Sequence, residues 1–144
     1  MPYWESYYHL VWGTKNRHPL ITPSRAELIR LSIAATCTER QALIHALGMM
    51  PDHIHLAVSI PPRFAVSDFV QWLKGASTRR INQHESGGPR DIFAWQAEYG
   101  MLTFGEKSLS VVVAYVENQE RHHAEETLLA RFEQLERPYT PPNS

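Results

Sequence analysis

The chain has 144 residues, a formal net charge of −1, 43% hydrophobic residues and 20% charged residues. This composition is typical of one soluble globular domain, and the near-neutral charge argues against nucleic-acid binding through bulk positive charge alone. No stretch approaches the roughly 20 apolar residues of a membrane-spanning helix, and the N-terminus does not resemble a signal peptide. The single cysteine, Cys37, excludes an intrachain disulfide, so we expect a reducing, cytoplasmic location.

The N-terminal third of the chain predicts a strand followed by a helix. The aromatic and β-branched run at 7–13 is typical of a strand. Thr22-Pro23-Ser24 followed by Glu27 predicts a helix start, with proline in the first turn and a Ser-x-x-Glu capping box. Apolar residues at helical spacing extend the helix to about Arg40. They are Ala26, Ile29, Ile33 and Cys37.

A histidine pair marks the next predicted hairpin. Residues 43–50 read as a strand, Pro51-Asp52 as a turn, and 53–60 as a strand that returns antiparallel. Alternation along a strand places His53 and His55 on one face and the apolar residues between and after them on the other. Two imidazoles so placed can converge on one metal ion or one phosphate. The simpler interpretation is a sheet with two polar residues on its solvent side.

The remaining elements complete an alternating pattern. Residues 67–84 predict a second amphipathic helix, and Trp95-to-Phe104 reads as a loop leading into a fourth strand. Ser108 is a plausible N-cap for a helix that continues through the polar run 117–121, although Val111–Val113 alone would resemble a strand. A last amphipathic segment at 128–135 and a Pro-rich tail at 138–144 follow.

The predicted order is β-α-β-β-α-β followed by additional C-terminal helices. This is the ferredoxin-like, split βαβ arrangement, an α+β fold with one antiparallel sheet. We expect a single domain over 1–144, with a core at about 7–123 and a C-terminal helix and tail at 124–144. We also expect the helices on one face of the sheet, which leaves the other face for a ligand or a second protomer.

Tyr115 and Gln119 form the second half of a candidate site. Residues four apart lie one above the other on a helix, so these two side chains share a face. With His53 and His55 they would supply neutral ligands, which leave a divalent ion such as Mg²⁺ or Mn²⁺ its full charge to polarise a phosphodiester. The tyrosine could then attack phosphorus in line. The alternative is a packed tyrosine beside a solvated glutamine.

These motifs give the chain a resemblance to a known family. The matching text is Tyr8-His9-Leu10-Val11-Trp12, Thr14-Lys15-Asn16-Arg17, Met50-Pro51-Asp52-His53-Ile54-His55-Leu56, Leu73-Lys74-Gly75, Trp95-Gln96-x-x-Tyr99-Gly100 and Tyr115-Val116-Glu117-Asn118-Gln119. In this order it resembles the single-tyrosine (Y1) His-hydrophobic-His (HUH) transposases of the IS200/IS605 type and their domesticated relatives, the REP-associated tyrosine transposases. The combination of Pro-Asp-His-x-His with Tyr-x-x-x-Gln is specific, whereas neither half is.

The resemblance implies a ferredoxin-like nuclease that acts on single-stranded DNA, commonly at an imperfect hairpin. His53, His55 and Gln119 would be the metal ligands, and Tyr115 would be the nucleophile. Cleavage would leave a 5′-phosphotyrosine and a free 3′-hydroxyl, and strand transfer would reverse that step on another DNA end. Family members act as homodimers, often with the tyrosine helix of one protomer completing the metal site of the other.

Other side chains have weaker claims to a role. Five basic residues could hold DNA phosphates, although a solvated surface is as good an interpretation for each. They are Lys15, Arg17, Lys74, Arg79 and Arg80. His9 could lie on the functional face of its strand, but we interpret it as a structural histidine. Asp52 is interpreted as a turn residue that could also orient an imidazole. For Trp95 and Tyr99 we expect core or interface packing.

Two alternatives to the nuclease stay open at this point. The first is a catalytically silent, hairpin-DNA-binding regulator derived from a transposase, which would bind strongly without metal and without cleavage. The second is an unrelated metallohydrolase or metal-binding protein on the same fold, in which Tyr115 would be dispensable while His53 and His55 remained essential.

Overall fold

The structure is a computed structural model that describes residues 4–85 and 92–118. The elements in chain order are β1 (Tyr7–Gly13), α1 (Pro23–Arg40), β2 (Leu43–Met50), β3 (His53–Ser59), α2 (Val66–His84), β4 (Gly100–Phe104) and α3 (Leu109–Glu117), with short 3-10 turns at η1 (Lys15–Arg17) and η2 (Glu106–Ser108). The predicted segments at 128–135 and 138–144 lie outside the described residues. Within the described ranges, no helix combines the length and the apolar character needed to cross a membrane.

The four strands form one sheet in the order β2-β3-β1-β4, and every neighbouring pair is antiparallel. Strands β1 and β3 lie at the centre, where Leu10 faces Leu56 and His9 faces Ala57 across the pair. This order confirms the predicted ferredoxin-like α+β fold, because the two β-α-β halves interleave to give it.

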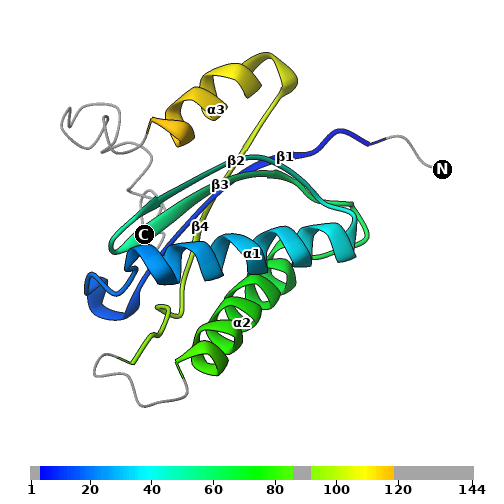
Figure 1. The fold of residues 1–144 in the computed structure, drawn as a ribbon. Coiled ribbons are helices and arrows are strands. Elements are labelled where there is room, and N and C mark those ends of the chain that lie inside the picture. The colour runs from blue at the N-terminus through cyan, green and yellow to red at the C-terminus, as the bar shows by residue number, and fades with distance from the viewer. Residues whose placement is uncertain (1–3, 86–91, 119–144) are drawn as a thin grey trace, which may run out of the picture.

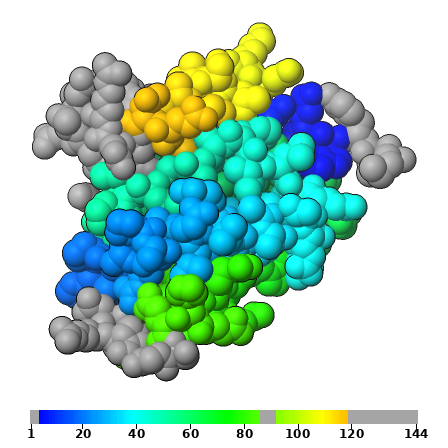
Figure 2. Space-filling model, in the orientation of Figure 1, coloured from blue at the N-terminus to red at the C-terminus, as the bar shows by residue number. Residues whose placement is uncertain are grey.

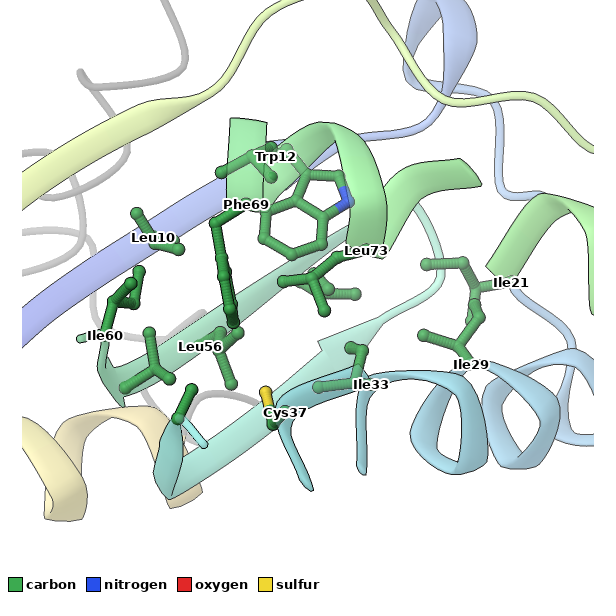
Figure 3. Close-up of a cluster of buried hydrophobic side chains, with 14 of the residues drawn as sticks. Leu10, Trp12, Ile21, Ile29, Ile33, Cys37, Leu56, Ile60, Phe69 and Leu73 are labelled. Carbon is green, nitrogen blue, oxygen red and sulfur yellow. The ribbon is translucent and has the colours of Figure 1, made fainter. Parts of the chain in front are cut away.

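The main core lies between the sheet and the helices α1 and α2 (Figure 1). Alternate residues of the central strands point into it, together with the apolar stripes of both helices, as the sequence periodicity predicts. The fully buried side chains there include Leu10, Trp12, Ile29, Ile33, Leu56, Ile60, Phe69 and Leu73 (Figure 3). Trp95 and Tyr99 pack against the same cluster, which confirms their predicted packing role.

Helix α1 begins two residues earlier than the predicted capping box would place its start. Thr22 is the N-cap, and its hydroxyl accepts a hydrogen bond from the backbone N–H of Arg25 at 3.3 Å. The predicted box from Ser24 to Glu27 is therefore wrong, because Pro23 already occupies the first helical position. The Glu27 carboxylate pairs instead with Arg30 at 2.7 Å.

Helix α3 corrects the expectation that one face of the sheet is left uncovered. It packs on the face opposite α1 and α2, so the sheet lies between two helical layers (Figure 1). In the space-filling view α3, yellow to orange, forms a ridge on the far side of the strands from α1 and α2 (Figure 2). A small apolar cluster holds it there. Its members are Ala46, Ala57, Val112, Tyr115 and Val116.

The start of α3 also differs in detail from the prediction. Ser108 lies at the expected N-cap position but belongs to the turn η2, and its side chain makes no capping hydrogen bond to the helix. The β-branched run at 111–113 is helical, as predicted, since the helix continues from Leu109 to Glu117.

The identity of the α1 cap can be tested by two matched substitutions. Thr22→Ala is expected to lower the free energy of unfolding by about 1 kcal/mol, because it leaves a helix-terminal N–H without its acceptor. Ser24→Ala should change it by a few tenths of a kcal/mol at most, as for an exposed substitution. Urea denaturation of both variants measures the difference. Equal losses, or a larger loss for Ser24→Ala, would support the predicted capping box at Ser24 instead.

Candidate active site

The two histidines of the hairpin lie under α3. His53 and His55 are 1% and 0% exposed, and their ring centroids are 5.1 Å apart with planes at 67°. Ile54 and Leu56, which alternate with them along β3, point into the main core on the other face. The alternation predicted for this strand is thus confirmed, and it places both imidazoles in the smaller layer between the sheet and α3.

Helix α3 brings Tyr115 to this pair. The Tyr115 ring centroid lies 5.7 Å from that of His55, with the two planes nearly perpendicular at 72°. Val112 and Val116, on the same side of the helix, pack with Tyr115 against Ala57 of β3. Because the helix is anchored by this apolar face, the tyrosine is 6% exposed and is directed at the histidine layer.

His9 of β1 completes the cluster. Its Nε2 atom lies 2.8 Å from Nδ1 of His55, and its ring centroid is 5.9 Å from that of Tyr115. Burial lowers the pKa of His9 to about 4, so the ring is neutral at neutral pH. The sequence interpretation of His9 as a structural histidine that could lie on the functional face agrees with this position on the face of His53 and His55. The signal was present in the sequence, because Leu10 and Trp12 must face the main core and therefore send His9 to the other face.

Asp52 and Arg17 hold the other histidine. The Nδ1 atom of His53 lies 2.7 Å from Asp52 Oδ1, and Arg17 Nη2 lies 3.2 Å from Asp52 Oδ2. Burial alone would raise the pKa of Asp52, but the hydrogen bond with His53 and the positive charge of Arg17 lower it, so the side chain is a carboxylate. A carboxylate can only accept a hydrogen bond, so the proton of the short contact is on His53 Nδ1. Asp52 therefore orients His53 as well as forming the turn.

Gly13 makes room for this arrangement beside His53, its partner across the β1–β3 pair. A Cβ atom at Gly13 would lie 3.0 Å from Cδ of Arg17 and 3.2 Å from the carbonyl oxygen of Asp52. Arg17 itself adopts a left-handed backbone conformation with φ of 55°. Such conformations are uncommon outside glycine and recur at functional sites.

The donor set fits a divalent metal ion. Histidines that bind metals usually make a hydrogen bond through their other ring nitrogen, and His53 and His55 both do so through Nδ1. In residues 4–85 and 92–118, no group of three or more His, Cys, Asp or Glu side chains could hold a metal. Gln119, the predicted third ligand, lies outside the described residues.

The predicted phosphate-binding residues divide between two places. Lys15 and Arg17 lie in η1 at the end of β1, and Arg17 reaches the histidine site. Lys74, Arg79 and Arg80 lie on α2, in the opposite helical layer. The α2 residues therefore do not join the histidine cluster.

The three basic residues of α2 have different surroundings. The Lys74 ammonium donates to the carbonyl oxygens of Gln96 and Glu98, both at 2.9 Å, and Arg80 Nε donates to Ser32 Oγ at 2.9 Å. Arg79 is exposed and lines a cleft of about 740 Å³ beside Lys74. DNA contact by these residues stays a prediction.

The fold and the site define a class of protein. A ferredoxin-like domain carries a His-x-His strand beneath a helix that supplies a tyrosine, and the same chain matches the family model described as IS200-like transposases over residues 2–119. The chain therefore belongs to the IS200-like transposase family, a family of DNA-transposing enzymes.

Individual relatives agree with this assignment. The chain is 31% identical over 115 residues to the ISDra2 transposase TnpA of Deinococcus radiodurans, covering 78% of this chain and 82% of that protein. It is 27% identical over 141 residues to the transposase of insertion sequence IS200 from Salmonella typhimurium, covering 94% and 87%.

Two solved structures share the fold. A crystal structure of an assigned transposase from Deinococcus radiodurans has a TM-score of 0.64 and 32% identity, covering 83% of this chain and 95% of that one. A REP-associated tyrosine transposase bound to a REP hairpin has the same TM-score at 18% identity, covering 85% and 74%. At this lower identity the likeness concerns the fold alone.

The buried ammonium of Lys74 predicts an alkaline gain in stability. Burial lowers its pKa from 10.5 to about 8, despite the opposing charge of Glu98. Between these values the unfolded chain holds a proton that the folded chain has released, so stability rises with pH by at most about 3 kcal/mol. Urea denaturation at pH 8 and pH 10.5 should show a larger gain in the wild type than in Lys74→Met. Equal gains in stability in both proteins would contradict a role of Lys74 in this pH dependence.

Proposed function

We propose that the protein is a metal-dependent single-stranded DNA endonuclease and strand transferase, acting at DNA hairpins through a 5′-phosphotyrosine intermediate. The observation that carries the proposal is the approach of Tyr115 to His55, 5.7 Å between ring centroids, on the sheet face that also presents His53. A tyrosine that only packed in the core would not need two imidazoles as neighbours.

His53 and His55 would hold the metal together with Gln119, and Mg²⁺ or Mn²⁺ suits such a set of imidazole and oxygen ligands. When bound, the ion supplies positive charge that polarises the phosphodiester. The chain's own contribution is orientation, because Asp52 fixes His53 through the 2.7 Å hydrogen bond. The fixed ring requires no reorganisation when charge develops at the phosphate.

Tyr115 would perform the covalent step. Its phenolic oxygen attacks phosphorus, the new O–P bond replaces the bond to the 3′-oxygen, and the phosphate stays on the 5′-oxygen of the downstream strand. The phenol loses one proton to the surroundings and the leaving 3′-oxygen gains one, so the step is balanced without an external nucleotide. Attack by the 3′-hydroxyl of another DNA end reverses the step and transfers the strand.

DNA must reach a site that is closed in this structure, since His53, His55 and Tyr115 are each no more than 6% exposed. We propose that α3 separates from the sheet to admit the strand. Its apolar contact with the sheet involves only a few buried side chains, of which Tyr115 is the largest, whereas α1 and α2 share the much larger main core. The smaller contact makes α3 the easier layer to displace.

Hairpin DNA is the proposed partner, and the structural neighbour bound to a REP hairpin supports this choice. Lys15 and Arg17 would meet phosphates beside the histidines, and Arg79, with Lys74 and Arg80 near it, would meet them along α2. We also propose a homodimer as the working assembly, which light scattering of the purified protein can measure.

The burial of Tyr115 favours one second candidate, a hairpin-binding regulator that has kept the fold but no longer cleaves. Such a protein would bind hairpins tightly in EDTA and would never form a covalent complex. The retention of His53, His55 and Tyr115 in one cluster weighs against it, because a silent binder has no need of a nucleophile beside metal ligands.

The nuclease proposal predicts a covalent adduct. Wild-type protein incubated with Mn²⁺ and single-stranded oligonucleotides, made from the palindromes that flank its coding region, should give a band resistant to SDS. Mass spectrometry should find the DNA on Tyr115. Tyr115→Phe and EDTA should abolish the band, whereas Tyr99→Phe, a partly buried tyrosine of the main core, should retain it. A wild type that binds the oligonucleotides without any adduct would leave the regulator as the answer.

The position of Tyr115 over the histidines of its own chain predicts activity in cis. Mixing His53→Ala with Tyr115→Phe protein, after denaturation and joint refolding, should therefore leave cleavage at background. Neither chain would have both its nucleophile and its ligands. Strong rescue in the mixture, absent from each variant alone, would mean that α3 serves the partner's histidines.

A further inference from the structure

His9 lies outside the proposed ligand set but makes a direct contact with the candidate metal ligand His55. Its Nε2 atom is 2.8 Å from Nδ1 of His55, and the two rings are tilted at 33° with centroids 5.0 Å apart. His9 is fully buried and rises from β1 opposite Ala57, one diagonal step from His55. The sequence alone favoured a structural role for it.

The short contact between two ring nitrogens has to contain one proton. A neutral imidazole carries its proton on only one of its two nitrogens, and the other nitrogen accepts. If His9 donates from Nε2, His55 holds its own proton on Nε2 and cannot offer that atom to a metal. If His55 donates from Nδ1, its Nε2 lone pair is available for coordination. The direction of this one hydrogen bond therefore decides whether His55 can act as a ligand.

His53 makes an equivalent hydrogen bond through Nδ1, and the direction of this bond is fixed. Asp52 can only accept, so His53 keeps its proton on Nδ1 and offers Nε2. Arg17 Nη2 also lies 3.3 Å from His53 Nδ1, but this nitrogen already donates to Asp52 and cannot accept from arginine. Both histidines thus engage Nδ1 within the protein, and each would reach a shared ion through Nε2.

The geometry points to His9 as a positioning residue that accepts the Nδ1 proton of His55 and so presents His55 Nε2 to the metal. This inference rests on the proposed metal-dependent function. His9 is not itself placed as a ligand, because the nitrogen nearest the site is engaged with His55. It does for His55 what Asp52 does for His53, but with a neutral acceptor.

The chain offers a matched set of substitutions. A glutamine at position 9 can place its amide oxygen about as far from the backbone as His9 Nε2, so His9→Gln should still accept the proton. His9→Asn carries the same amide on a shorter side chain and should fall short. His9→Phe fills the space without any acceptor. If His9 served packing alone, His9→Phe would behave more like the wild type than His9→Gln does. The hydrogen bond predicts the reverse order.

The first readout is the tautomer of His55 in the metal-free wild-type protein, measured by long-range ¹H–¹⁵N correlation of the imidazole rings. We expect the proton on Nδ1 in wild type and His9→Gln, and a shift toward Nε2 in His9→Phe and His9→Asn. His53 should keep its Nδ1 proton in all four proteins, which serves as the internal control. An Nε2-protonated His55 in the wild type, or a tautomer indifferent to His9, would overturn the inference.

The second readout is Mn²⁺ affinity, measured by electron paramagnetic resonance. Loss of a hydrogen-bond partner of a ligating histidine typically weakens binding by about 10- to 100-fold, so His9→Phe should show a loss of this size and His9→Gln a smaller one. Unchanged affinity in His9→Phe would overturn the positioning role. A wild type that binds no Mn²⁺ would instead overturn the proposed metal-dependent function, and the tautomer measurement would still decide whether His9 controls His55.

Discussion

The antiparallel register between β1 and β3 is the constraint on which the rest of the site depends. It pairs Leu10 with Leu56 on the face of the main core, and it places His9 beside His55 on the other face. Because side chains alternate along a strand, a slip of one residue would send the histidines into the core and the leucines under α3. Burial of the leucines therefore fixes the positions of the imidazoles, although the two sets of side chains lie on opposite faces of the sheet.

The two helical layers differ in content: one holds the main hydrophobic core, and the other holds the candidate site. The helices α1 and α2 enclose a core of large side chains that includes Trp12 and Phe69, and the buried Arg25 joins α1 to the end of α2 through Glu85 at 2.7 Å. The layer under α3 has a few apolar residues, mostly small, together with Tyr115 and a group of imidazoles. A polar cluster under a lightly packed helix is the part of a domain most easily opened, whereas the main core keeps the histidines in place.

Periodicity in the sequence was sufficient for the fold because each element has its own apolar pattern. The alternation around His53 and the 3.6-residue spacing from Ile29 to Cys37 predict their faces correctly. What periodicity could not supply was the position of α3, because its packing depends on the small residues Ala46 and Ala57 leaving space on the sheet. Periodicity also could not predict the contact between His9 and His55. These residues are 46 positions apart in the sequence, and tertiary packing sets the strand register that brings them together.

The central claim is that one ion binds to both histidines through Nε2 with Tyr115 beside them in the same chain. The most direct measurement is a crystal structure of the protein soaked in Mn²⁺, with the ion located by its anomalous scattering. The account predicts one peak at roughly 2.0–2.3 Å from Nε2 of both His53 and His55, by analogy with the usual lengths of metal–imidazole bonds. A peak bonded through Nδ1, no peak at the histidines, or a Tyr115 ring remote from His55 would contradict it.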